Sequence, residues 1–299
     1  MNNLIFYKKQ FNLANATFIP IEHEEAMVAI VYKVIFLKSS ALILKICPRA
    51  EDYWREIYFL NFLADSLPVA KILQVEPPTI SSYGAILMEC FSGNLLNKKD
   101  ITDKISYEAG ALLASLHLNR VPQYGDLTQE HSLSPDPRTP FMNKFEESFS
   151  ECSNTLPKDL IEKSWQYYKT HVDALNLVDG ACLIHRDFRP GNIMVLDGKI
   201  TGIIDWASAR ASFAEEDFSP LELDEWSSES KLKKFFLKGY ASIRTIPKYQ
   251  FIITLLLMNR VFSIIGFIVK KGTWNNINAS IYQANLKYLD DFFKKNNYY

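Results

Sequence analysis

The sequence lacks the features that mark exported, metal-rich or nucleic-acid-binding proteins. Its four cysteines are widely separated and include no metal-spaced pair, which favours reduced thiols in a cytosol. There is no tract rich in lysine and arginine, and the net charge of −1 gives no reason to expect a nucleic acid or an anionic membrane surface as a partner. Residues 1–9 contain neither a long apolar region nor a small-residue cleavage site, so we expect a cytoplasmic protein.

One segment, residues 251–269, is apolar and close to the ~20 residues needed to cross a bilayer. Asn259, Arg260 and Ser263 interrupt it near its middle. A central arginine alone costs roughly 2.5–3.5 kcal/mol on membrane-insertion scales. The sequence therefore predicts a buried core helix here and no membrane partner.

The run from His185 to Asn192 carries the strongest chemical signal in the chain. It reads His-Arg-Asp-Phe-Arg-Pro-Gly-Asn. In phosphoryl transfer this pattern supplies an aspartate, here Asp187, that accepts a proton from an attacking hydroxyl, and an asparagine, Asn192, that can hold Mg²⁺. The sequence therefore predicts a phosphoryl-transfer centre, in which His185 has an architectural part and Arg189 steadies the loop or touches phosphate.

The segment after Asn192 is predicted to form a β-hairpin. The β-rich runs 193–196 and 199–204 are separated by Asp197-Gly198, a pair that favours a type I′ turn.

This hairpin is expected to supply a second metal ligand. If Leu196 pairs with Lys199, Asn192 lies opposite Ile203. Because side chains alternate along a strand, Asp205 then shares a face with Asn192, at a Cα distance of roughly 7–8 Å. Two converging oxygen ligands suit Mg²⁺. The alternative is a surface hairpin whose asparagine and aspartate only cap turns.

At these residues the chain resembles the aminoglycoside phosphotransferase and choline kinase family, small-molecule kinases with a protein-kinase-like fold. The resemblance covers most of the chain and rests on His185-Arg186-Asp187 to Asn192 and Ile204-Asp205-Trp206, with weaker matches at Lys45, Arg55-Glu56, Leu67-Pro68-Val69 and Leu87-Met88-Glu89. By this resemblance Asp187 would be the catalytic base and Lys45 the phosphate anchor. Asn192 and Asp205 would be the metal ligands.

The expected fold is α+β and two-lobed. Residues 1–92 would form a small antiparallel sheet lobe with one helix and a hinge, and residues 93–299 a larger, mostly helical lobe for catalysis and substrate binding. The patterns indicate strands at 27–37, 41–46 and 80–91, a hinge at 92–94, and helices at 51–64, 106–118, 140–150, 158–176, 230–240 and 249–271.

Lys45 lies in an apolar strand, where an unpaired ammonium would be costly to bury. Glu56, in the helix expected behind the sheet, is the predicted partner, as in kinases that hold a lysine against nucleotide phosphates. Glu51 and Asp52 are alternative partners, and an edge-strand lysine that faces solvent is the alternative interpretation.

The strand 87–91 is expected to bind the nucleotide base. By the resemblance, the Glu89 carbonyl and the Phe91 amide would face the base edge, although a buried core strand would have the same sequence.

The chain departs from the family at residues 21–28, where the phosphate loop is usually glycine-containing but no glycine occurs. Side chains make close backbone approach to phosphate harder.

An acidic segment follows the predicted metal site. Between residues 211 and 230 there is no lysine or arginine, and seven carboxylates occur: Glu215, Glu216, Asp217, Glu222, Asp224, Glu225 and Glu229. A negative wall would concentrate a cationic, aminoglycoside-like or amino-alcohol acceptor, with Glu222 and Asp224 in contact with it. Trp206 or Trp226 could add a cation–π contact. Alternatively, these acids cap helices and face solvent, and the tryptophans pack.

Three functions remain open. The first is a kinase that uses ATP or GTP with Mg²⁺ to phosphorylate a hydroxyl of a small molecule. The second is a protein Ser/Thr kinase, which the Ile-Asp-Trp sequence in place of Asp-Phe-Gly opposes. The third is an inactive nucleotide-binding regulator, suggested by the glycine-free loop. The acceptor, the choice between ATP and GTP, and the oligomeric state are not fixed by the sequence.

Overall fold

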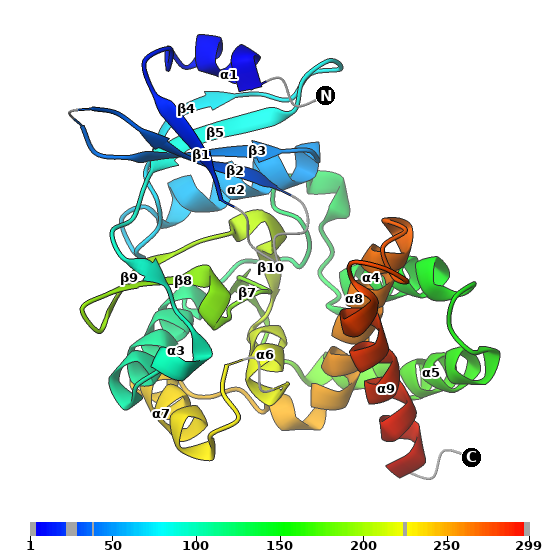
Figure 1. Ribbon diagram of the computed structural model, residues 1–299. Coiled ribbons are helices and arrows are strands. Elements are labelled where there is room, and N and C mark those ends of the chain that lie inside the picture. Colours follow the sequence, from blue (N-terminus) through cyan, green and yellow to red (C-terminus); the bar gives the residue numbers. More distant parts are fainter. Residues whose placement is uncertain (1–3, 22–28, 38, 224–225, 296–299) are drawn as a thin grey trace.

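The structure is a computed structural model that describes residues 4–21, 29–37, 39–223 and 226–295. A sheet lies at one end of the molecule and helices make up most of the rest (Figure 1). Helix α1 lies on the outer face of the sheet, and α2 lies between the sheet and the helical part. This is the predicted two-lobed, kinase-like α+β fold.

The sheet is antiparallel, with strand order β1-β2-β3-β5-β4. Its elements are α1 (Leu4–Gln10), β1 (Thr17–Pro20), β2 (Ile30–Ile35), β3 (Leu42–Cys47), α2 (Ala50–Leu63), β4 (Ile72–Glu76) and β5 (Gly84–Glu89). In β3, Leu44 and Ile46 pack with Tyr7 of α1 in a small outer core. Because strand side chains alternate, Lys45 faces the helical part.

The helical part contains two hydrophobic cores. Its elements are β6 (Asn94–Leu95), α3 (Asp103–His117), α4 (Arg138–Cys152), α5 (Lys158–His171), β7 (Ala181–Ile184), β8 (Ile193–Leu196), β9 (Lys199–Ile203), β10 (Arg210–Phe213), α6 (Ser219–Glu222), α7 (Ser230–Ala241), α8 (Ile253–Lys270) and α9 (Ala279–Lys295). The first core joins α3 and α7 to α2 and the sheet. The second joins α4, α5, α8 and α9, which stand together at one side (Figure 1).

The predicted strands at 27–37, 41–46 and 80–91 correspond to β2, β3 and β5, and the predicted helices correspond to α2, α3, α4, α5, α7 and α8. Helices α1 and α9 were not expected.

The glycine-free loop lies almost entirely outside the described residues, apart from Ile21, whose amide donates to the Val31 carbonyl. Helix α8 is long and apolar enough to cross a membrane by length and composition, but 56% of it is buried inside the protein.

Helices α3 and α7 approach each other at two glycines. A Cβ atom on Gly110 would lie 1.9 Å from the Phe236 carbonyl oxygen, and one on Gly239 would lie 1.8 Å from the Tyr107 carbonyl oxygen. Both contacts are with backbone atoms, so the helices would have to move apart to accept a methyl group.

We therefore expect Gly239→Ala to destabilise the protein by about 1–3 kcal/mol, despite the ~1 kcal/mol by which alanine is the better helix former. Urea unfolding followed by circular dichroism measures the difference. Lys234→Ala, on the exposed face of the same helix, is the control and should change stability by less than about 0.5 kcal/mol. Equal stabilities for the two variants would show that the helices separate without penalty.

Candidate active site

The loop that carries Asp187 begins where the buried strand β7 ends. The Asp217 carboxylate accepts hydrogen bonds from the backbone amides of His185 (2.8 Å) and Arg186 (2.6 Å). Arg186 has φ 66°, in the left-handed region that non-glycine residues rarely adopt. His185 is buried, and its Nε2 lies 3.1 Å from the Ile204 carbonyl oxygen. Strain of this kind persists only where surrounding contacts enforce it, so the loop is held in one conformation.

The Asp187 carboxylate is bound from three sides. Asn192 Nδ2 donates to Oδ2 over 2.7 Å, Arg189 Nε donates to the same oxygen over 3.0 Å, and Arg260 Nη2 donates to Oδ1 over 3.3 Å. Burial alone would raise the pKa of Asp187, but the guanidinium groups of Arg260 and Arg189 hold it below its ordinary value. The side chain is 25% exposed. It is therefore a charged, reachable proton acceptor.

Lys45 bridges the two lobes. Its Nζ lies 2.8 Å from Glu56 Oε2 and 2.8 Å from Asp205 Oδ1. The predicted pairing with Glu56 is confirmed, whereas the alternative Asp52 binds Arg49 and Arg55. Burial favours the neutral amine, but the carboxylates of Asp205 and Glu56 raise the pKa of Lys45 above its usual value. The lysine is held as a cation.

The hairpin that leads to Asp205 confirms one part of the prediction and corrects another. Asp197 (φ 50°) and Gly198 (φ 70°) form the expected left-handed two-residue turn, and Leu196 pairs with Lys199. However, a bulge shifts the register between Met194 and Val195, so that Ile203 lies opposite Ile193 rather than Asn192. The register predicted by strict alternation was therefore wrong by one residue.

Asn192 and Asp205 come together by another route. Asn192 lies in a short 3₁₀ turn, and Asp205, beyond the end of β9, has φ 65°. The Ile204 amide donates to the Asn192 carbonyl oxygen over 3.0 Å, which places the two backbones side by side. The left-handed turn at Asp205, not a strand face, directs its carboxylate toward Lys45.

The side chains of Asn192 and Asp205 offer oxygen atoms that suit a magnesium ion. Asn192 uses Nδ2 on Asp187, which leaves its amide oxygen as a ligand, and the Asp205 side chain is 49% exposed with Oδ1 on Lys45. Among the described residues, no group of three or more His, Cys, Asp or Glu side chains could hold a metal ion. Magnesium in kinases is commonly held by one or two protein oxygens and completed by phosphates and water.

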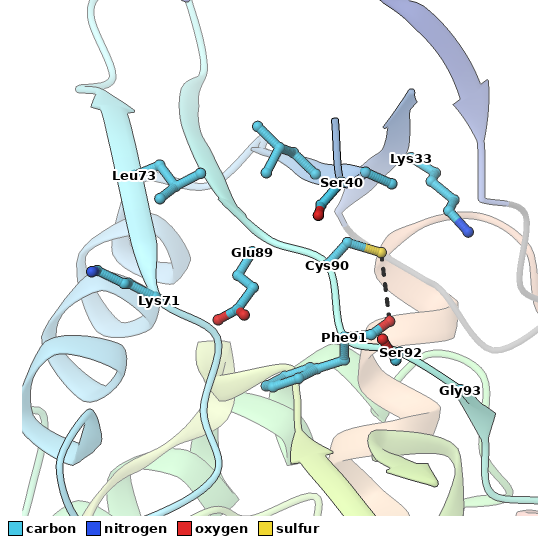
Figure 2. A pocket seen from close by; sticks show the side chains of 11 residues that line it. Lys33, Ser40, Lys71, Leu73, Glu89, Cys90, Phe91, Ser92 and Gly93 are labelled. Atoms are coloured by element: carbon cyan, nitrogen blue, oxygen red, sulfur yellow. Dashed lines mark hydrogen bonds between the residues drawn. The ribbon is translucent and has the colours of Figure 1, made fainter. Parts of the chain in front are cut away.

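The strand β5 continues into a short connection, Cys90 to Gly93, that leads to the helical part (Figure 2). A cavity of about 670 Å³ adjoins it and is lined by Glu89 and Phe91, with Lys33 and Lys71 at its sides. Lys45, Asp187 and Asp205 do not line this cavity, so it is separate from the group of residues around Lys45. No hydrogen bond among the described residues uses the Phe91 amide.

Residues 30–246 match the model of the phosphotransferase enzyme family. This chain belongs to that family. The match includes every residue placed in the site so far except Arg260.

Solved structures with the same fold include aminoglycoside phosphotransferases. A thermostable mutant of APH(4)-Ia, in a ternary complex with AMP-PNP and hygromycin B, has a TM-score of 0.72 at 11% identity and covers 97% of this chain and 98% of its own. ADP-bound APH(2'')-Ib has a TM-score of 0.63 at 12% identity, with 97% of each chain covered. A GDP complex of a mutant aminoglycoside 2'-phosphotransferase-IIIa has a TM-score of 0.68 at 16% identity, with 99% of each chain covered. No curated protein matches.

Five carboxylates of the acidic segment are described, and four of them do not form the predicted negative wall, whereas Glu229 is exposed. Glu215 is buried, Glu216 pairs with Arg186 and Arg210, and Asp217 binds His117 and the loop that carries Asp187. Glu222 binds Lys233 and the Tyr249 hydroxyl. These carboxylates are therefore engaged within the protein.

The predicted aromatic contacts are also corrected. Trp226 is 1% exposed, and its Nε1 donates to Ser106 Oγ over 2.9 Å. Trp206 is fully buried and stacks on Phe59 of α2. Neither ring is accessible to a cationic acceptor. Asp224, the remaining predicted acceptor contact, lies outside the described residues.

Arg260 was recognised in the sequence only as an interruption of an apolar helix. Its contact with Asp187 makes it part of the site of the phosphotransferase. The available signal was a charged residue among buried neighbours, which requires a polar partner from elsewhere in the chain.

Lys45→Met tests the phosphate-anchor assignment of this phosphotransferase. We expect phosphoryl transfer to fall by at least about 10-fold, because a charged donor to the phosphates is lost. Stability should also fall, since Glu56 would be left buried and unpaired. Steady-state kinetics and thermal unfolding separate the two effects, and the double variant Lys45→Met/Glu56→Gln should regain stability but not activity.

The matched control is Lys9→Met, which removes an exposed lysine from α1, on the outer face of the sheet. Recovery of activity in the double variant would mean that Lys45 serves folding only.

Proposed function

We propose that this protein transfers the γ-phosphoryl group of ATP or GTP to a hydroxyl group of a small molecule. The observation that carries the proposal is the arrangement around Lys45, which joins Glu56 of the sheet lobe to Asp205 of the helical lobe. Asn192 links Asp187 to the segment of Asp205, because its Nδ2 donates to the Asp187 carboxylate and its carbonyl oxygen accepts from the Ile204 amide. The residues proposed as phosphate anchor, metal ligand and proton acceptor therefore lie near one another.

In this mechanism Asp187 accepts a hydrogen bond from the acceptor hydroxyl and takes its proton as the oxygen attacks phosphorus. Asn192 fixes the Asp187 carboxylate through Nδ2. Mg²⁺, held by Asn192 and Asp205, would neutralise charge on the phosphates. Lys45, released in part from Asp205, would bind phosphate oxygens. Most of the acceleration comes from positioning and electrostatics.

For the donor, we propose that the base edge lies against the Glu89 carbonyl and the Phe91 amide. The Phe91 ring covers Gly202, where a Cβ would come within 2.4 Å of it. Gly93 has φ 101°, and a Cβ there would lie 2.1 Å from the Val195 carbonyl oxygen, so glycine is required for the chain to pass. Relatives bind AMP-PNP, ADP and GDP, which leaves both adenine and guanine nucleotides as candidates.

For the acceptor, we propose the class of small hydroxylated molecules. The hygromycin B complex of a relative supports this class. A cationic acceptor loses the support of the acidic segment, because Glu216 and Glu222 are paired within the protein.

The experiment is to measure nucleoside diphosphate release from ATP and GTP with a panel of cationic, neutral and anionic small alcohols and with a generic protein substrate. Turnover with a small alcohol supports the proposal. Turnover with the protein alone would assign a protein kinase, and nucleotide binding without turnover under any condition would assign a regulator.

A further inference from the structure

Arg260 is an arginine in the middle of an apolar helix. On α8 it stands between the buried residues Asn259 and Val261, and its side chain is 18% exposed. A guanidinium group in such a setting is stable only with hydrogen-bond acceptors, because desolvation of a charge is costly. Among the described residues, its acceptors include Asp187 Oδ1 and the Arg186 carbonyl oxygen, each at 3.3 Å.

These two bonds connect different cores. Helix α8 belongs to the core that it shares with α4, α5 and α9, whereas Phe188 of the catalytic loop packs in the core of α3 and α7. Arg260 therefore ties the loop that carries Asp187 to the core of α4, α5, α8 and α9.

The two oxygens of the Asp187 carboxylate also have different partners. Asn192 holds Oδ2 and Arg260 holds Oδ1, so rotation of the carboxylate about its Cβ–Cγ bond is restricted from both ends. Arg189 Nε spans the two oxygens, at 3.2 and 3.0 Å. A carboxylate fixed in this way keeps one orientation toward an incoming hydroxyl.

We propose that Arg260 is a positioning residue that sets the orientation of the Asp187 carboxylate. Because Arg260 belongs to α8, this orientation depends on the position of that helix. The inference rests on the proposed function. It assigns a role in the reaction to a helix that lies outside the segment matched by the family model. A shift of about 1 Å in a catalytic group is enough to reduce a rate by about 100-fold.

Kinetics of Arg260 variants test the inference. For Arg260→Gln we expect kcat to fall by about 10- to 100-fold while the KM for ATP stays within about 2-fold, with either water or the best alcohol of the panel as acceptor. Arg260→Lys should recover part of the loss, and guanidinium chloride at millimolar concentration should partly rescue Arg260→Ala, whereas potassium chloride should not.

Arg138→Gln is the matched control, since it removes an arginine that pairs with Asp136 and Asp173 in the same group of helices. An Arg260→Gln enzyme with the kcat of this control would overturn the inference.

A double-mutant cycle separates positioning from general support of the fold. If Arg260 acts through Asp187, its replacement should change the rate by less than about 3-fold in an Asp187→Asn background. The same fold-loss in both backgrounds would overturn the proposal.

Backbone hydrogen exchange gives a readout that needs no turnover. In Arg260→Gln the amides of residues 185–192 should exchange faster than in the parent protein, while those of β3 should not change. If the parent protein shows no turnover, the proposed function fails, and this exchange measurement still decides the inference: unchanged exchange in 185–192 would refute it.

Discussion

Asp187→Asn is expected to reduce turnover by at least about 100-fold while the protein remains folded and binds nucleotide. The carboxamide keeps the shape of the side chain, but it is a far weaker proton acceptor than a carboxylate, and general-base catalysis contributes about 10²- to 10⁴-fold. Nucleotide affinity should persist, because Lys45 and Asp205 are unchanged.

The measurement is kcat with the best acceptor of the panel, together with ATP affinity by calorimetry. Asp197→Asn provides the matched control, because it makes the same chemical change at the exposed turn of the neighbouring hairpin, where asparagine also accepts a positive φ. Turnover within about 3-fold of the parent enzyme would remove Asp187 from the mechanism.

The sequence was sufficient for the parts of the site that follow from local chemistry. The Lys45 pairing could be predicted because a buried ammonium needs an anion and the following helix offers few. The turn at Asp197 and Gly198 could be predicted because few other residue pairs adopt two successive positive φ angles.

The register of that hairpin could not be predicted, because the bulge depends on tertiary contacts. The Thr201 hydroxyl donates to the Ser92 carbonyl oxygen over 3.0 Å, and the Phe91 ring occupies the space over Gly202. Both contacts come from the connection between the lobes, far away in the sequence. A count of alternating residues contains no information about such neighbours.

The prediction of a negative wall from the acidic segment was wrong for a related reason. Its charges were counted along the chain, whereas their partners come from other elements, such as His117 of α3, Arg186 of the loop after β7 and Lys233 of α7. A run of carboxylates without local cations therefore says little about the charge of a surface until the fold places the cations.

Asp205→Asn is expected to abolish the magnesium dependence of nucleotide binding. In the structure the Asp205 carboxylate pairs with Lys45 and is half exposed, so it is available to a cation that arrives with the nucleotide. Removal of its charge takes away the anionic member of the two-residue ligand set, and Asn192 alone offers one neutral oxygen. We expect ATP affinity in the presence of Mg²⁺ to fall by at least about 10-fold, to the value found without the metal.

The fold should survive this change, because Lys45 keeps Glu56 as a buried counter-ion at 2.8 Å. Calorimetric titrations of ATP with and without Mg²⁺, on the parent protein and on Asp205→Asn, form the test, and Asp197→Asn again controls for the loss of one negative charge. A parent protein that binds ATP equally well with and without Mg²⁺ would refute the metal assignment. If the parent depends on Mg²⁺ and the variant depends on it to the same extent, the ion is held by other groups, and the role of Asp205 is limited to fixing Lys45.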